Sequence, residues 1–240
     1  MKRTVIYLCI IFSLSLLFLS CNKTRTKTLN RILKTESGDY SNEKISKERI
    51  KELEDGIKEY SKDVERVVKA NAEIGVYYRM MALEYLDLKM YKLALENLEK
   101  SMEYYPSNPV LSYYAGLSEA NIARSEASEI KSSVLFKQAE NYYIAAVRLK
   151  SNYSDAMYAL SVLYLFDLDS PDNAKPLLEK MLSLNPKNWE AMSLYARYKV
   201  LTGDIDGAID LYAKISEDAW DDNMKHQAAL NRNSLLAGRS

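Results

Sequence analysis

The chain has 240 residues, and its 33 basic and 33 acidic side chains cancel. A nucleic-acid-binding protein needs a dominant basic surface, so this balance excludes that class of partner. With two cysteines and one histidine, the chain also lacks the ligands for the common metal sites, and we expect no metal and no cofactor.

The first 20 residues have the pattern of an export signal. Lys2 and Arg3 precede the apolar run "VIYLCIIFSLSLLFLS", which ends on a small residue. This order of charged, apolar and small residues is typical of a secretory signal peptide. The apolar run is short for a membrane span, which needs about 20 apolar residues. We therefore predict a signal peptide over 1–20.

Cys21 stands where this apolar run stops. The sequence Leu19-Ser20-Cys21 resembles the end of a bacterial lipobox, although Phe18 replaces the usual aliphatic residue. The resemblance implies cleavage before Cys21, lipid attachment to it, and anchoring to a membrane of the bacterial cell envelope, facing the periplasm or the cell surface. The alternative is an ordinary signal peptide or an uncleaved anchor with an incidental cysteine. Cys9 lies inside the predicted signal, which leaves Cys21 as the only thiol of the exported protein.

Residues 21–44 are predicted to form a basic tether. Five basic residues and no acidic residue lie between Asn22 and Lys34. Near an anionic membrane each basic residue would add about 1 kcal/mol of attraction. The alternative is a tether that is simply solvated.

From about Ile45 onward the apolar residues recur at three- and four-residue spacing, which predicts an all-α protein. The segment 45–74 carries one apolar stripe, formed by Ile50, Leu53, Ile57, Tyr60, Val64 and Val67. We interpret it as the N-terminal capping helices of a helical array. A coiled-coil seam is the alternative.

A repeat follows over 75–222. Ala94, Ala139, Ala174 and Ala208 are each followed four residues later by a large residue: Leu98, Tyr143, Leu178 and Tyr212. A small residue precedes each alanine by twelve places or somewhat more: Ala82, Gly116, Ser161 and Ala196. The interval from Ala94 to Ala139 is the longest of the three, which predicts a longer helix pair in the second unit.

This register resembles the tetratricopeptide repeat (TPR), a helix-turn-helix unit of about 34 residues with a proline at its end. The stretch "YYRMMALEYLDLKMYKLALENLEKSMEYYPSNP" is the closest match. The resemblance implies a TPR solenoid of about four units, with boundaries at 75–108, 109–153, 154–188 and 189–222. The segment 223–240 is predicted to be a C-terminal capping helix, because TPR arrays need polar end units.

The resemblance also implies a site. Proteins of this family bind a protein or peptide partner in a concave groove lined by the first helix of each unit. By register the predicted groove residues are Arg79, Leu83, Tyr113, Leu117, Tyr158, Val162 and Arg197. Two tyrosines at the centre and a basic residue towards each end favour an extended partner with an apolar middle and acidic flanks. The alternative is that the tyrosine rings fill the core.

The sequence offers no catalytic residues. His226 is the only histidine, and no nucleophile–base pair or phosphate-binding glycine loop accompanies it, so we expect no enzyme. The favoured function is a lipid-anchored TPR scaffold for protein–protein interaction, with resemblance to lipoproteins of outer-membrane or pilus assembly. The alternatives are a solute-binding accessory lipoprotein of a transporter, favoured by a closed pocket, and a surface adhesin.

Overall fold

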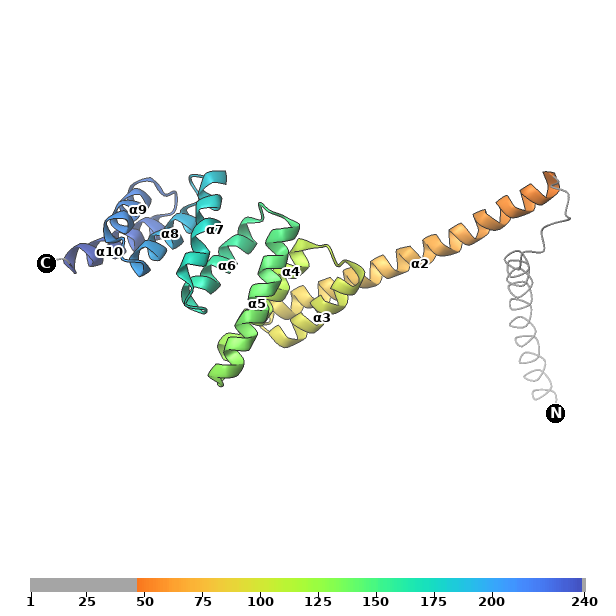
Figure 1. Ribbon diagram of the computed structural model, residues 1–240, viewed down its shortest axis with the longest axis horizontal. Coiled ribbons are helices and arrows are strands. Elements are labelled where there is room, and N and C mark those ends of the chain that lie inside the picture. The colour runs from red at the N-terminus through yellow and green to blue at the C-terminus, as the bar shows by residue number, and fades with distance from the viewer. Residues whose placement is uncertain (1–46, 239–240) are drawn as a thin grey trace, which may run out of the picture. The chain divides into compact units, whose positions relative to one another are not determined.

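The computed structural model describes residues 47–238, which fall into two units that divide after Val64. The described residues form α-helices and no strand, which confirms the all-α prediction (Figure 1). The helices are α2 (Lys47–Asp87), α3 (Tyr91–Tyr104), α4 (Pro109–Ser125), α5 (Glu129–Leu149), α6 (Ser154–Phe166), α7 (Pro171–Leu184), α8 (Trp189–Leu201), α9 (Ile205–Asp218) and α10 (Asp222–Ala237).

The helices of the second unit stack in chain order. From α3 to α10 each helix packs against the next one, and α4 also contacts α6, as α6 contacts α8. The helices α4, α6 and α8 are the first helices of successive pairs, so their mutual contacts place them along one wall. This arrangement is the predicted TPR solenoid.

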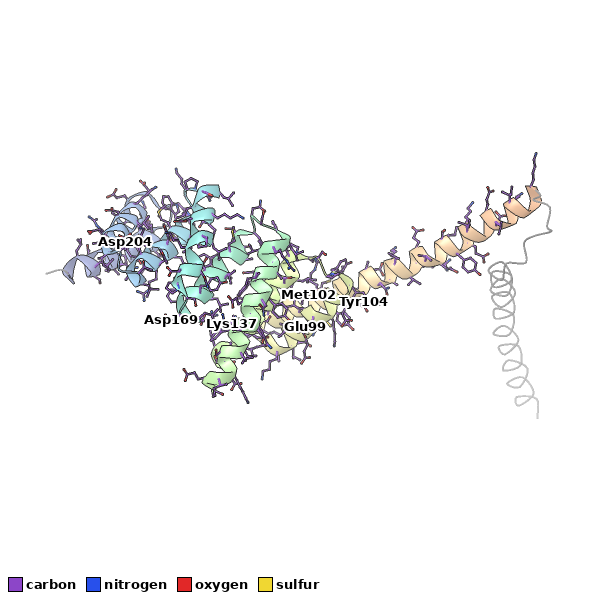
Figure 2. All side chains as sticks on the ribbon, viewed as in Figure 1. Glu99, Met102, Tyr104, Lys137, Asp169 and Asp204 are labelled. Atoms are coloured by element: carbon purple, nitrogen blue, oxygen red, sulfur yellow. The ribbon has the colours of Figure 1, made fainter. Side chains whose placement is uncertain are left out.

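Helix starts in the array are set by local capping. The side chains of Asn108, Asn188 and Asp221 accept hydrogen bonds from backbone N–H groups of the helices that they precede. Asp204, which is labelled in Figure 2, accepts a hydrogen bond of 3.0 Å from the backbone N–H of Gly207 at the start of α9. Such caps satisfy backbone donors that have no partner within the helix.

The repeated alanines and the large residues that follow them form the core. Their side chains are all at most 5% exposed, and the set is Ala94, Leu98, Ala139, Tyr143, Ala174, Leu178, Ala208 and Tyr212. The small residue of the second unit is required by close packing, because a Cβ atom on Gly116 would lie 2.7 Å from Cδ1 of Tyr143. The size pattern in the sequence is therefore a packing pattern between the helices of a pair.

The second pair is longer than its neighbours. Helix α4 has 17 residues and α5 has 21, against 13 or 14 in each helix from α6 to α9. The first turns of α5 carry Ile130 and Val134, which are both exposed. A hydrogen bond of 2.8 Å from Ser132 Oγ to the carbonyl oxygen of Ala123 joins this end of α5 to α4.

The N-terminal end differs from the prediction. The sequence predicts capping helices over 45–74 and a first repeat that begins at 75, but α2 is one unbroken helix of 41 residues. Gly75 does not interrupt it. Instead this buried glycine lets α3 approach, since a Cβ atom there would lie 2.7 Å from Tyr104 Cβ, and its carbonyl oxygen accepts a hydrogen bond of 2.8 Å from Ser101 Oγ.

The first part of α2 carries an exposed apolar stripe. Five of its residues are between 46% and 68% exposed: Ile50, Leu53, Ile57, Val64 and Val67. Near the C-terminus, α10 packs on α9, because Ala228 is buried in one cluster with Tyr212 and Ile215. Between residues 47 and 238, no helix combines the length and the apolar character that a membrane crossing requires.

Candidate partner-binding groove

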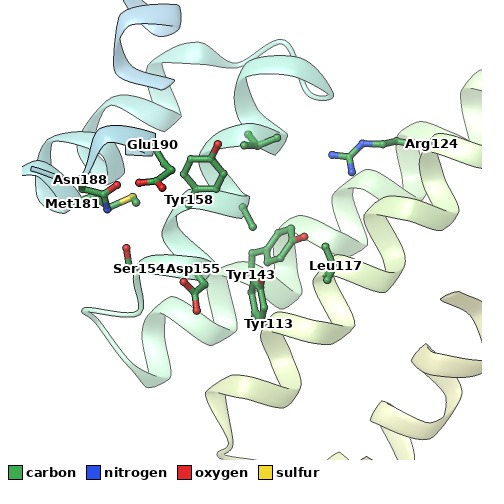
Figure 3. Close-up of a pocket in the computed structure, with 12 residues that line it drawn as sticks. Tyr113, Leu117, Arg124, Tyr143, Ser154, Asp155, Tyr158, Met181, Asn188 and Glu190 are labelled. Carbon is green, nitrogen blue, oxygen red and sulfur yellow. The ribbon is translucent and has the colours of Figure 1, made fainter. Parts of the chain in front are cut away.

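A groove of about 600 Å³ lies along α4 and α6 and ends at the start of α8. Four of the seven predicted groove residues line it: Tyr113, Leu117, Tyr158 and Val162. Figure 3 shows these helices and the side chains between them. The first helices of three successive pairs thus form most of the groove, and Tyr143 of α5 and Met181 of α7 complete its lining.

Helical geometry explains why these four residues meet. Tyr113 and Leu117 are four residues apart on α4, and Tyr158 and Val162 are four apart on α6, so each pair occupies one face of its helix. Because α4 and α6 contact each other, the two faces form one wall.

The two groove tyrosines have different environments. The ring of Tyr113 is half-buried in a tyrosine cluster, with its centroid 5.1 Å from that of Tyr114, 6.2 Å from that of Tyr143 and 5.5 Å from that of Tyr153. Tyr158, at 36% exposure, has a ring surface open to a ligand. Tyr113 therefore supports the wall, and Tyr158 presents its ring.

Burial and nearby carboxylates raise the pKa of both phenols. Burial raises the pKa of Tyr113, and the charge of Asp155 raises it further. Burial also raises the pKa of Tyr158, with a second contribution from the charge of Glu190. The same two carboxylates thus lie close enough to act on the rings, and Figure 3 shows Glu190 beside Tyr158.

Asp155 and Glu190 are the groove residues that sequence analysis missed. Each lies in the first turn of its helix, α6 or α8, where the helix dipole favours a negative charge. Within the described part of the chain, neither carboxylate forms an ion pair. The sequence does hold a signal for them, since Asp155 lies three residues before Tyr158 and Glu190 lies seven residues before Arg197, spacings that put each carboxylate on the helix face of a predicted groove residue.

The one basic residue that lines the groove is already paired. Arg124, near the end of α4, donates from Nε to Oδ1 of Asp167 at 3.1 Å and from Nη2 to Oδ2 at 2.6 Å. This two-bond pair joins α4 to the residue that follows α6 and raises the pKa of Arg124. Among the residues that line the groove, the charges of Asp155 and Glu190 are therefore left without a compensating cation.

The remaining predicted residues lie elsewhere. Arg79 and Leu83 are half-buried on α2 and do not line this groove, and neither does Arg197. The guanidinium of Arg197 lies 6.0 Å from the centroid of the Phe166 ring, which is a cation–π distance. Cys21 lies outside the described residues. No cluster of three or more potential metal ligands occurs over residues 47–238.

Comparison with known proteins supports the fold assignment. A family model of the tetratricopeptide repeat matches residues 165–231. A TPR repeat-containing protein of Borreliella burgdorferi is 25% identical over 211 residues, which cover 87% of this chain and 90% of that protein.

Two solved structures share the architecture at low sequence identity. A thermophilic TPR protein of Thermus thermophilus has a TM-score of 0.57 and 22% identity, with 72% of this chain and 87% of that chain covered. YrrB, described as a TPR protein with an unusual peptide-binding site, has a TM-score of 0.56 and 21% identity, with 72% and 82% covered. The chain thus has the TPR fold, which is suited to protein–protein interaction.

Proposed function

We propose that this protein is a non-enzymatic, lipid-anchored scaffold that holds an extended segment of a partner protein in the groove along α4, α6 and α8. The observation that carries the proposal is the exposed ring of Tyr158 beside Glu190, in a groove that Asp155 also lines, with neither carboxylate in an ion pair among the described residues. An open, elongated wall suits a peptide better than a small solute, which would need an enclosed pocket.

The charges of the groove select the partner. A lysine or arginine of the bound segment would meet Glu190 and the face of Tyr158, which attracts a cation through its ring quadrupole. Asp155 adds a second negative charge to the same groove. Apolar residues on either side of that cation would pack on Leu117 and Val162. This partner differs from the acidic-flanked segment favoured by the sequence, because Arg79 and Arg197 lie outside the groove whereas the carboxylates lie inside it.

Selection from a random peptide library tests the groove. We expect enriched peptides to carry a lysine or arginine between apolar residues. The double variant Asp155→Asn/Glu190→Gln should lower the affinity for these peptides about tenfold or more, because a hydrogen bond to a charged group contributes about 1.5–3 kcal/mol. Calorimetry on one selected peptide, with its lysine and with alanine in that place, measures the effect.

The matched control removes two exposed carboxylates of α9, Asp210→Asn and Glu217→Gln, and should leave the affinity unchanged. Tyr158→Ala should weaken binding of both the lysine and the alanine peptide. Selection of acidic peptides, or equal losses in the groove variant and the α9 control, would contradict the proposed groove.

We also propose that Cys21 carries the lipid, at a bacterial envelope membrane facing the periplasm or the cell surface, where the scaffold would serve outer-membrane, secretion or pilus assembly. The support is the lipobox-like end of the apolar run, Leu19-Ser20-Cys21.

Cys21→Ala should abolish incorporation of radiolabelled palmitate and leave the signal peptide uncleaved by the lipoprotein signal peptidase. Cys9→Ala, within the predicted signal, is the control and should retain both labelling and cleavage. Continued palmitate labelling of the Cys21→Ala protein would rule out this anchor.

A further inference from the structure

The exposed stripe of α2 has the spacing of a coiled-coil seam. Its residues alternate three- and four-residue steps without a gap: Ile50, Leu53, Ile57, Tyr60, Val64 and Val67. In heptad terms Ile50, Ile57 and Val64 occupy a positions, and the other three occupy d positions. This regularity extends over about three heptads, and no described segment covers it.

The residue types at these positions favour a pair of parallel helices. β-Branched residues at a, with leucine at d, are typical of parallel two-stranded coiled coils. Ile50, Ile57 and Val64 are β-branched, and Leu53 is at d. The stripe is therefore self-complementary, since two copies in register pack like residues together.

The charged residues of this segment lie mostly outside the seam, where a second copy would not bury them. Most lie at the outer b, c and f positions: Lys51, Asp55, Lys58, Glu59, Lys62, Glu65, Arg66 and Lys69. Parallel pairing brings each g position next to the e position five residues later in the other helix. Here these pairs are Gly56 with Ser61 and Asp63 with Val68, neither of which repels.

The seam ends where α2 begins to contact α3 and Tyr105, the residue that follows α3. The carbonyl oxygen of Ala72 accepts a hydrogen bond of 2.8 Å from Tyr105 Oη, and Gly75 contacts α3. Ala72 and Gly75 follow the last seam residue, Val67, and their contacts bring α3 alongside α2. The length of α2 available for pairing is therefore residues 50–67.

We propose that α2 joins two copies of this chain through a parallel coiled coil formed by residues 50–67. The dimer depends on protein concentration, because three heptads give a short seam and isolated helices of this length are marginal in water. It would present two partner-binding arrays together, so that a partner with two binding segments gains avidity. The dimer itself does not depend on the function proposed for the groove.

Light scattering on the full chain tests the proposal, with Cys9→Ser and Cys21→Ser to remove native thiols and a mild detergent throughout. Over a concentration series we expect the mass to rise from monomer to dimer. Ile57→Asp/Val64→Asp should keep the mass at that of the monomer, whereas Lys58→Asp/Lys62→Asp, at b and f positions, should retain the dimer. A monomer at every concentration, or a dimer that survives the Ile57/Val64 change, would overturn the proposal.

Cysteine cross-linking in the same background decides the partner and its direction. In a parallel dimer in register, Ile50→Cys lies next to its own copy and should form a disulfide-linked dimer on mild oxidation, while Lys62→Cys on the opposite face should not. In an antiparallel pair residue 50 would lie opposite residue 67, so Ile50→Cys would not cross-link. Equal cross-linking of both variants, no cross-link of Ile50→Cys, or its linkage only to a different protein in the native membrane would reject parallel pairing of two copies through α2.

Discussion

Replacing Leu178 by alanine should lower the free energy of unfolding by about 2–5 kcal/mol, because removal of a buried leucine side chain leaves a cavity. The side chain of Leu178 is fully buried in the core cluster that joins α4, α5, α6, α7 and α8. The substitution therefore removes packing contacts between neighbouring helix pairs, and such contacts hold a repeat array together. Urea unfolding followed by circular dichroism measures it.

Leu184 provides the control on the same helix, since it is 57% exposed, and Leu184→Ala should change the free energy of unfolding by no more than about 0.5 kcal/mol. Leu98→Ala, at the equivalent buried position of the first pair, should resemble Leu178→Ala. If Leu178→Ala and Leu184→Ala unfold at the same urea concentration, the repeat register assigned to the chain is incorrect.

Replacing Gly116 by leucine should destabilise the array by about 1–3 kcal/mol through overpacking. The ring of Tyr143 is only 3% exposed and leaves no space, since even a Cβ atom at Gly116 would lie 2.7 Å from Cδ1 and 2.8 Å from Cε1 of this ring. Helices α4 and α5 would have to separate, or the ring would have to leave its rotamer. Thermal unfolding should show a lower melting temperature.

The most direct comparison is between alanine substitutions of two glycines, one in a close helix contact and one on an open helix surface. Gly116→Ala should destabilise despite the better helix propensity of alanine, which contributes about 1 kcal/mol. Gly56→Ala on α2 should not lower the melting temperature, because no atom lies within 4 Å of the added Cβ. A melting temperature that is unchanged or raised by Gly116→Ala would show that the contact with Tyr143 is not tight.

The repeat and four of the seven predicted groove residues could be derived from the sequence because both follow from helical periodicity. A residue four places after Ala94 or Ala174 must lie on the same helix face, and the recurrence of that pattern predicts the stacking of successive pairs. The same reasoning places Tyr113 and Tyr158 at equivalent positions of neighbouring first helices, and both line the groove.

The course of α2 could not be derived in this way. The position of Gly75 suggests a boundary, since an isolated glycine costs a helix about 1 kcal/mol and weakens the expectation that it continues. Contacts with α3 compensate there, because the missing side chain admits Tyr104 and Tyr105. Tertiary packing therefore decided that the helix runs unbroken to Asp87.

The sequence by itself thus determined the helical class, the repeat register and the helix faces, since each depends on residues within one or two turns of the same helix. Only the tertiary structure decided that Tyr113 is half-buried while Tyr158 is exposed, because that depends on rings from other helices. It also decided the charge of the groove. Arg124 is neutralised by Asp167, 43 residues away in the chain, whereas no cation of residues 47–238 forms an ion pair with Asp155 or Glu190, and pairing over such distances is invisible to local periodicity.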